Sequence, residues 1–147
     1  MGKSVPKILL VEDSPTARSL VRVFLMGLPN PIVEAESAED AMTALDDASI
    51  EVVVTDNQLP GVQGLDFVKR IRSDSRSHVA RIGIVMLTGQ DVQTGAATAG
   101  VDFFIRKPVK DSTLRDAVMR LIEARRQAAE GPAQVAASSD SGALKPR

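Results

Sequence analysis

The stretch Val52-Val53-Val54-Thr55-Asp56-Asn57-Gln58-Leu59-Pro60-Gly61 decides the fold of this chain. Three consecutive β-branched residues are typical of a strand that is covered on both faces. The apolar run then ends on a carboxylate, Asp56, and the chain turns at Pro60-Gly61. A charged group at the edge of a core is unfavourable unless it is paired or has a functional role, so we expect its partner in the rest of the sequence.

Similar apolar runs recur along the chain and alternate with segments of helical spacing. The predicted strands are Ile8–Val11, Ile32–Val33, Val52–Val54, Ile84–Leu87 and Phe103–Ile105. Between and after them, apolar side chains repeat at helical intervals over 17–28, 38–45, 67–71 and 114–122. Ser14-Pro15 and Ser37 are typical helix starts. This alternation of strand and helix predicts an α/β fold, in which helices cover both faces of a five-stranded parallel sheet.

Two segments depart from this pattern. Residues 91–99 are mostly small and include Gly95, so we expect a short or mobile helix there. From residue 127 the composition shifts to Ala, Ser, Gly and Pro, which can bury little apolar area. We therefore expect one domain over residues 1–126, followed by a disordered tail or linker over residues 127–147.

Composition excludes several classes of protein. The chain has 147 residues, a net charge of −1 and no cysteine, so a disulfide scaffold, a thiolate metal site and a cysteine nucleophile are excluded. No basic stripe indicates nucleic-acid binding by this domain. No segment is typical of a secretory signal or long enough to span a bilayer, and neither a P-loop nor a dinucleotide motif occurs. We expect a cytoplasmic protein that does not bind membranes.

Polar residues follow four of the five predicted strands directly. Glu12-Asp13 follow the first strand, Asp56 the third, Thr88 the fourth and Lys107 the fifth. In a doubly wound sheet, ligands bind beyond the carboxyl ends of the strands, so we expect these side chains to converge. The second strand ends at Glu34-Ala35-Glu36, which is typical of solvated surface.

Three carboxylates, a hydroxyl and an ammonium group indicate a specific chemistry. Crowded carboxylates repel one another, and a divalent cation relieves this repulsion. Oxygen ligands without His or Cys favour magnesium, Mg²⁺, which keeps several waters and leaves room for phosphoryl oxygens. Aspartate can form an aspartyl phosphate, so Asp56 is the candidate nucleophile, and Lys107 and Thr88 could stabilise the transferred group.

This ordered set resembles the receiver domain of two-component response regulators, in particular the chemotaxis regulators. The resemblance covers residues 5–126 and rests on ILLVEDS, VVVTDNQLPGVQGLDFVKRIR, VMLTG and GVDFFIRKPV. It implies a flavodoxin-like (βα)5 fold with strand order 2-1-3-4-5. It also implies that a sensor histidine kinase or a histidine phosphotransfer protein phosphorylates Asp56, which switches a surface for a downstream protein target. Such a phosphorelay protein is not an enzyme beyond its own phosphorylation and dephosphorylation.

The resemblance also assigns individual roles. Glu12, Asp13 and Asp56 would hold Mg²⁺ together with the backbone carbonyl of Gln58. Thr88 and Phe104 would form the switch, with Thr88 bonding a phosphoryl oxygen. Residue Lys107 would pair with the phosphate, and a cis peptide bond would precede Pro108.

Two other classes of protein remain open at this stage. A pure interaction module of the same fold would be expected to lack one of the site residues, and all are present. A phosphatase with an aspartyl nucleophile would need a second acid two residues after Asp56, where Gln58 stands. Binding of Mg²⁺ separates the first class from a phosphoacceptor, and turnover of phosphate esters separates the second.

Overall fold

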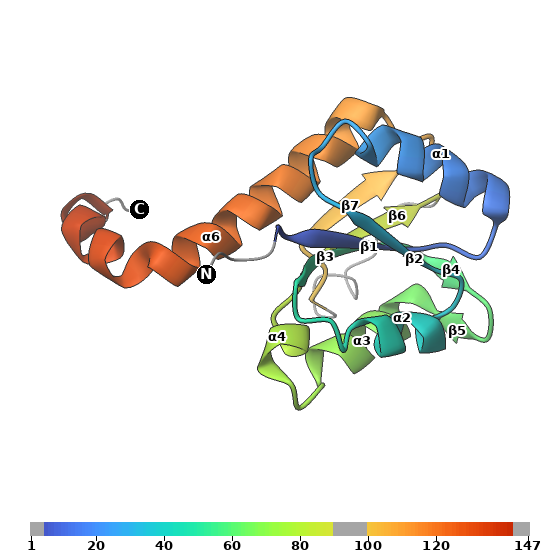
Figure 1. Ribbon diagram of the computed structural model, residues 1–147, viewed down its shortest axis with the longest axis horizontal. Helices are drawn as coiled ribbons and strands as arrows, with labels where there is room; N and C mark the ends of the chain where they lie inside the picture. Colours follow the sequence, from blue (N-terminus) through green and yellow to red (C-terminus); the bar gives the residue numbers. More distant parts are fainter. Residues whose placement is uncertain (1–4, 90–99, 143–147) are drawn as a thin grey trace.

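The computed structural model describes residues 5–89 and 100–142, with only the backbone of residues 129–142. A parallel sheet lies between two layers of helices (Figure 1). The elements in chain order are β1 (Lys7–Val11), α1 (Pro15–Leu25), β2 (Ile32–Ala35), α2 (Ala38–Ala44), β3 (Ile50–Asp56), β4 (Gln58–Leu59), β5 (Val62–Gln63), α3 (Gly64–Arg72), α4 (Ser77–Ala80), β6 (Gly83–Thr88), β7 (Phe103–Arg106) and α6 (Asp111–Gly142).

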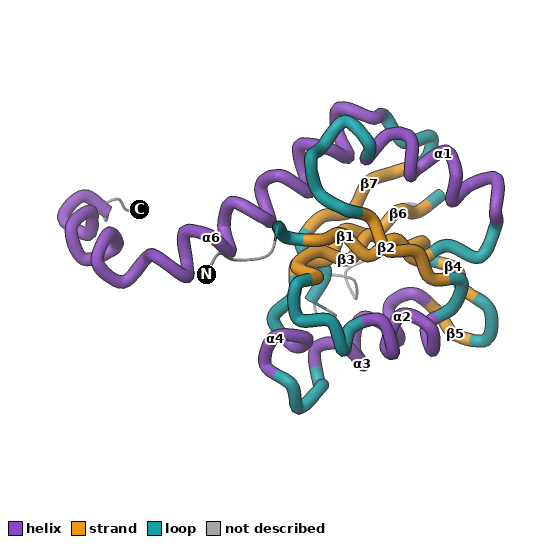
Figure 2. Tube along the Cα trace, viewed as in Figure 1, coloured by secondary structure: helices purple, strands orange, loops and turns teal. Residues whose placement is uncertain are grey.

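The five main strands form one sheet in the order β2-β1-β3-β6-β7, with every neighbouring pair parallel. This is the 2-1-3-4-5 order predicted for a flavodoxin-like fold, and it confirms the fold class. Strand β3 lies at the centre, and Val52 to Val54 are fully buried, as their continuous apolar run predicted. Figure 2 shows the same arrangement, with strands in the middle and helices above and below.

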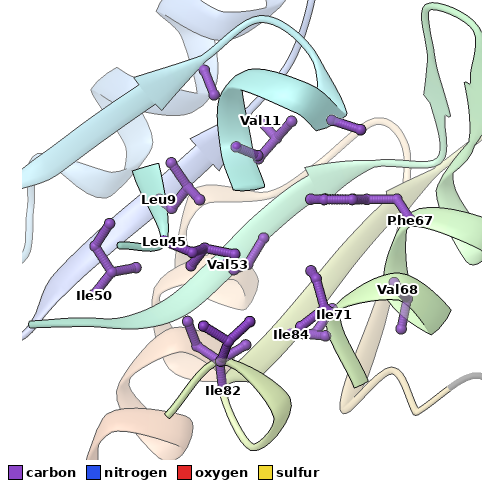
Figure 3. Close-up of a cluster of buried hydrophobic side chains, with 14 of the residues drawn as sticks. Leu9, Val11, Leu45, Ile50, Val53, Phe67, Val68, Ile71, Ile82 and Ile84 are labelled. Atoms are coloured by element: carbon purple, nitrogen blue, oxygen red, sulfur yellow. The ribbon is translucent and has the colours of Figure 1, made fainter. Parts of the chain in front are cut away.

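Successive side chains of the central strands point to opposite faces of the sheet and so supply two separate cores. On one face, Val52 and Val54 pack in a cluster with residues of α1 and α6. On the other face, Val53 packs with α2 and α3, around Phe67 (Figure 3). Each face of the sheet is therefore covered by its own layer of helices.

The start of α1 confirms the capping prediction, whereas its buried face differs from the apolar stripe expected over residues 17–28. The Ser14 hydroxyl accepts a hydrogen bond from the Ala17 N–H, and proline occupies the first helical turn. Leu20 was expected in the stripe but is 55% exposed, because the inward face is centred on Val21 and Leu25.

A small β-hairpin and a short helix were not predicted. Strands β4 and β5 pair antiparallel, joined by Pro60 and Gly61, and Gly61 has φ of 74°. This positive φ suits glycine and confirms the predicted turn. The short helix α4 precedes β6. The helix expected over 91–99 lies outside the described residues.

Helix α6 continues beyond the predicted domain boundary. It runs to Gly142, whereas the sequence predicted that regular structure ends near residue 126. Figure 1 shows that its last part projects away from the sheet. The Gln and Ala residues after 126 are compatible with helix, which a composition-based boundary does not take into account. The division into a domain and a tail stays a prediction.

No helix within the described residues is both long and apolar enough to cross a membrane.

Candidate functional site

Asp56 is the last residue of the central strand, and its carboxylate is held at the edge of the core. The residue is only 7% exposed. Its Oδ1 accepts a hydrogen bond from Lys107 Nζ at 2.5 Å, and its Oδ2 accepts one from the Gln58 N–H at 3.1 Å. This buried carboxylate therefore has a cation and a backbone donor on its two oxygens.

The backbone of the neighbouring strands brings Lys107 to Asp56. In the sheet register, Asp56 lies opposite Leu87, and Thr88 lies opposite Arg106. The Lys107 N–H donates to the Thr88 carbonyl at 2.8 Å, which continues the β6–β7 ladder by one residue. Since parallel strands end at the same edge, two residues 51 positions apart meet there. The side-chain nitrogen of Lys107 is thus on the same side of the sheet as the carboxylate of Asp56.

Glu12 follows β1, and its side chain is nearly as buried as that of Asp56. The residue is 5% exposed, and its Oε2 accepts a hydrogen bond from the Ser14 N–H at 3.0 Å. Burial raises the pKa of the Glu12 carboxyl above its usual value, and the nearby carboxyls of Asp56 and Asp13 add to this rise. The Ser14 N–H and the Lys107 ammonium act in the opposite direction on the same pKa. Glu12, Asp13 and Asp56 therefore interact as one acidic cluster.

The other predicted site residues differ in their burial. Asp13 and Gln58 are exposed, and Thr88 is 5% exposed at the end of β6. Phe104 of β7 is partly buried and packs against the cluster of apolar residues beneath α2 and α3. The Lys107–Pro108 peptide bond is cis, as the resemblance implied.

The donor set fits a hard cation, although it is not a complete cage. No group of three or more His, Cys, Asp or Glu side chains in the described part of the chain forms a ready metal site. The buried carboxylates of Glu12 and Asp56 nevertheless repel each other, and a divalent cation bound between them would relieve this repulsion. Mg²⁺ needs few protein carboxylates, because it keeps several waters.

One contact was not foreseen from the sequence. Arg18 of α1 donates from Nη1 to the backbone carbonyl of Glu12 at 2.8 Å and from Nε to Glu34 Oε1 at 2.9 Å. No role was predicted for Arg18 from the sequence, and Glu34 was interpreted as ordinary solvated surface. The sequence signal was an arginine one turn beyond the acidic loop, together with acids at the end of the neighbouring strand.

Comparisons with known proteins agree with this geometry. Residues 8–119 match the response regulator receiver domain. Chemotaxis protein CheY-3 of Vibrio cholerae is 34% identical over 121 residues, which are 80% of this chain and 92% of that protein. Chemotaxis protein CheY1 of Helicobacter pylori is 37% identical over 115 residues, which are 75% of this chain and 91% of that protein.

Solved structures of response regulators have the same fold as this chain. The chemotaxis response regulator CheY4 of Vibrio cholerae superposes with a TM-score of 0.71 at 25% identity, covering 80% of this chain and 99% of that one. A response regulator receiver protein from Pseudomonas putida superposes with a TM-score of 0.70 at 27% identity, covering 81% and 99%.

Proposed function

This chain belongs to the response regulator receiver family of two-component signalling, and from that premise we propose that it accepts a phosphoryl group on Asp56. The observation that carries the proposal is the buried Asp56 carboxylate, which has Lys107 Nζ at 2.5 Å and shares an acidic cluster with Glu12. A structural ion pair needs only Asp56 and Lys107. The additional buried acid is unfavourable for folding, so it indicates a chemical purpose.

The cation is proposed to be Mg²⁺, held by Glu12, Asp13 and Asp56 with the backbone carbonyl of Gln58. Their oxygen-only chemistry and mutual repulsion support this choice. When bound, Mg²⁺ would neutralise charge on the carboxylates and on the phosphoryl oxygens. Asp13 is exposed, and such a residue can act through a water of the hydrated ion.

The proposed donor is a phosphohistidine on a sensor histidine kinase or a histidine phosphotransfer protein. An oxygen of the Asp56 carboxylate attacks the phosphorus in line, and a new O–P bond forms. The P–N bond to the donor imidazole breaks, its electron pair stays on the ring nitrogen, and that nitrogen is protonated. Lys107 balances charge on the transferred oxygens. The family is not a conventional enzyme family, since the protein itself carries the product.

The proposed output is a change in a protein-interaction surface. The hydroxyl of Thr88 would bond a phosphoryl oxygen, and Phe104 would move with it toward the core. In support, Thr88 directly follows Leu87, which lies opposite Asp56, and Phe104 is only partly buried. The target would be a downstream protein rather than nucleic acid or a membrane. We further propose a cytoplasmic receiver unit over residues 1–126, with residues 127–147 as a tail or linker.

The experiment is incubation of the full chain with Mg²⁺ and acetyl phosphate, followed by intact mass spectrometry. The wild-type chain should gain the mass of one phosphoryl group, and Asp56→Asn should gain none. Asp116→Asn, an exposed aspartate of α6, is the matched control and should behave as wild type. An unmodified wild-type chain, or an Asp56→Asn variant that is modified equally, would defeat the proposal. The first result would favour a pure interaction module.

A further inference from the structure

The guanidinium group of Arg18 joins three chain segments beside the acidic cluster. Besides its bonds to the Glu12 carbonyl and to Glu34, its Nη2 lies 3.8 Å from Glu36 Oε2. The side chain is 15% exposed, which is low for an arginine on an outer helix. Because a guanidinium carries five donors in a fixed planar fork, it can hold a carbonyl and carboxylates at the same time.

Glu12 is held by hydrogen bonds to both its backbone and its side chain, and Arg18 makes one of them. The Glu12 N–H donates to the Ala35 carbonyl of β2 at 3.0 Å, and the Glu12 carbonyl accepts from Arg18 at 2.8 Å. The side chain accepts from the Ser14 N–H at 3.0 Å. The backbone donor, the backbone acceptor and the carboxylate of Glu12 therefore each have a defined partner. Of these three, the Arg18 contact is the one made by a side chain from another element.

We propose that Arg18 is a positioning residue for the cation site: by holding the Glu12 carbonyl, it sets the direction of the Glu12 and Asp13 carboxylates toward Asp56. This inference rests on the proposed function, because it assumes that these carboxylates bind Mg²⁺. It extends that function to the end of β2, since Glu34 anchors the Arg18 guanidinium. Glu34 of β2 thus acts on the site without touching the ion.

Two effects of Arg18 on cation binding oppose each other. Its positive charge repels a cation, so simple removal of the charge would strengthen binding. Its hydrogen bonds orient the ligands, and loss of such an outer partner typically weakens metal binding by about 10-fold to 100-fold. A variant that tests the positioning role must therefore keep the positive charge at residue 18 and remove the several donors of the guanidinium group. Lysine does this, because it has a single nitrogen that cannot hold both the Glu12 carbonyl and Glu34 in the same way.

The test measures the Mg²⁺ dissociation constant of the full chain by titration followed by NMR amide shifts. Arg18→Lys should raise this constant by about tenfold. The matched control is Arg22→Lys, because Arg22 also pairs with Glu34, at 3.2 Å, but has no recorded bond to Glu12. Arg22→Lys should stay within about twofold of wild type. Free energies of unfolding in metal-free buffer, measured in parallel, separate a lost ligand orientation from a general loss of stability.

The outcomes differ for the two proposals. If the wild-type chain binds no Mg²⁺, the proposed function itself fails. If the wild-type chain binds Mg²⁺ and Arg18→Lys binds equally well, or if both lysine variants weaken binding equally, only the positioning role fails. Glu34→Asp provides a second route should Arg18→Lys not fold, because it keeps the charge and shortens the anchor by one methylene group. It should weaken Mg²⁺ binding in the same direction, and an unchanged constant would overturn the inference.

Discussion

Replacing Gly64 with alanine would place a methyl group against the main chain that follows Asp56. Gly64 is the first residue of α3, and its N–H donates to the Asn57 carbonyl at 2.7 Å. A Cβ atom built on Gly64 would lie 2.6 Å from the Asn57 oxygen and 2.8 Å from the Asn57 Cα. Carbon–oxygen contacts normally begin at about 3.3 Å, so the loop carrying Asn57 would have to move.

The expected magnitude follows from two opposing contributions. Forcing an extra methyl group into a packed site costs about 1–3 kcal/mol, and here the neighbour is backbone rather than a flexible side chain. Alanine recovers about 0.4–1 kcal/mol, because it restricts the unfolded chain more than glycine does. Gly64→Ala should therefore lower the free energy of unfolding by about 1–2 kcal/mol.

Urea denaturation followed by far-UV circular dichroism measures this change. The control is Gly89→Ala, where no heavy atom lies within 4 Å of the added Cβ and φ is outside the left-handed region. Its free energy of unfolding should stay within about 0.5 kcal/mol of wild type or rise slightly. An unfolding midpoint for Gly64→Ala equal to that of wild type would refute the steric argument.

Three further changes test other parts of the structure. Ser37→Ala removes the acceptor of the Asp40 N–H at the start of α2, 3.1 Å away, and should lower the free energy of unfolding by about 1 kcal/mol in urea titrations; an unchanged midpoint would contradict this. Lys107→Met should slow phosphorylation by acetyl phosphate about 100-fold in timed mass spectra, and a rate within tenfold of wild type would refute the charge-balancing role. Glu12→Gln in metal-free buffer tests the raised pKa of Glu12. Because the folded state holds that proton more tightly than the unfolded state, wild-type stability relative to Glu12→Gln should fall as pH rises from about 4 toward 7. Denaturation at a series of pH values checks this, and parallel stabilities would contradict it.

The parallel sheet could be predicted because buried parallel strands have a distinct sequence pattern, whereas the order of its strands was implied by the family resemblance. Val52 to Val54 form a continuous apolar run, and a run of this kind has few alternatives in a chain of alternating strands and helices. The meeting of Asp56 and Lys107 followed from the same argument. The carboxyl ends of all strands in one parallel sheet lie at the same edge, whatever their separation in sequence, and here β6 lies between the strands that lead to Asp56 and Lys107.

The β4–β5 hairpin and the contacts of Arg18 could not be predicted, because the spacing of apolar residues does not show them. The β4–β5 hairpin has two residues in each strand, too few to show an alternating pattern. Helical spacing indicates that Arg18 lies on α1, but its bond to Glu34 joins residues 16 positions apart. A long side chain with several rotatable bonds can reach many partners, and only coordinates select among them.

The path of helix α6 has a practical consequence for studies of this chain. The helix runs back from the carboxyl edge of the sheet, and its extension leaves the body beyond the opposite edge (Figure 1). A reporter or affinity label fused to the end of this helix would therefore lie on the opposite side of the domain from Asp56. Such a label should leave the proposed phosphodonor free to approach Asp56, whereas a label inserted between β4, which begins two residues after Asp56, and β5 should obstruct it.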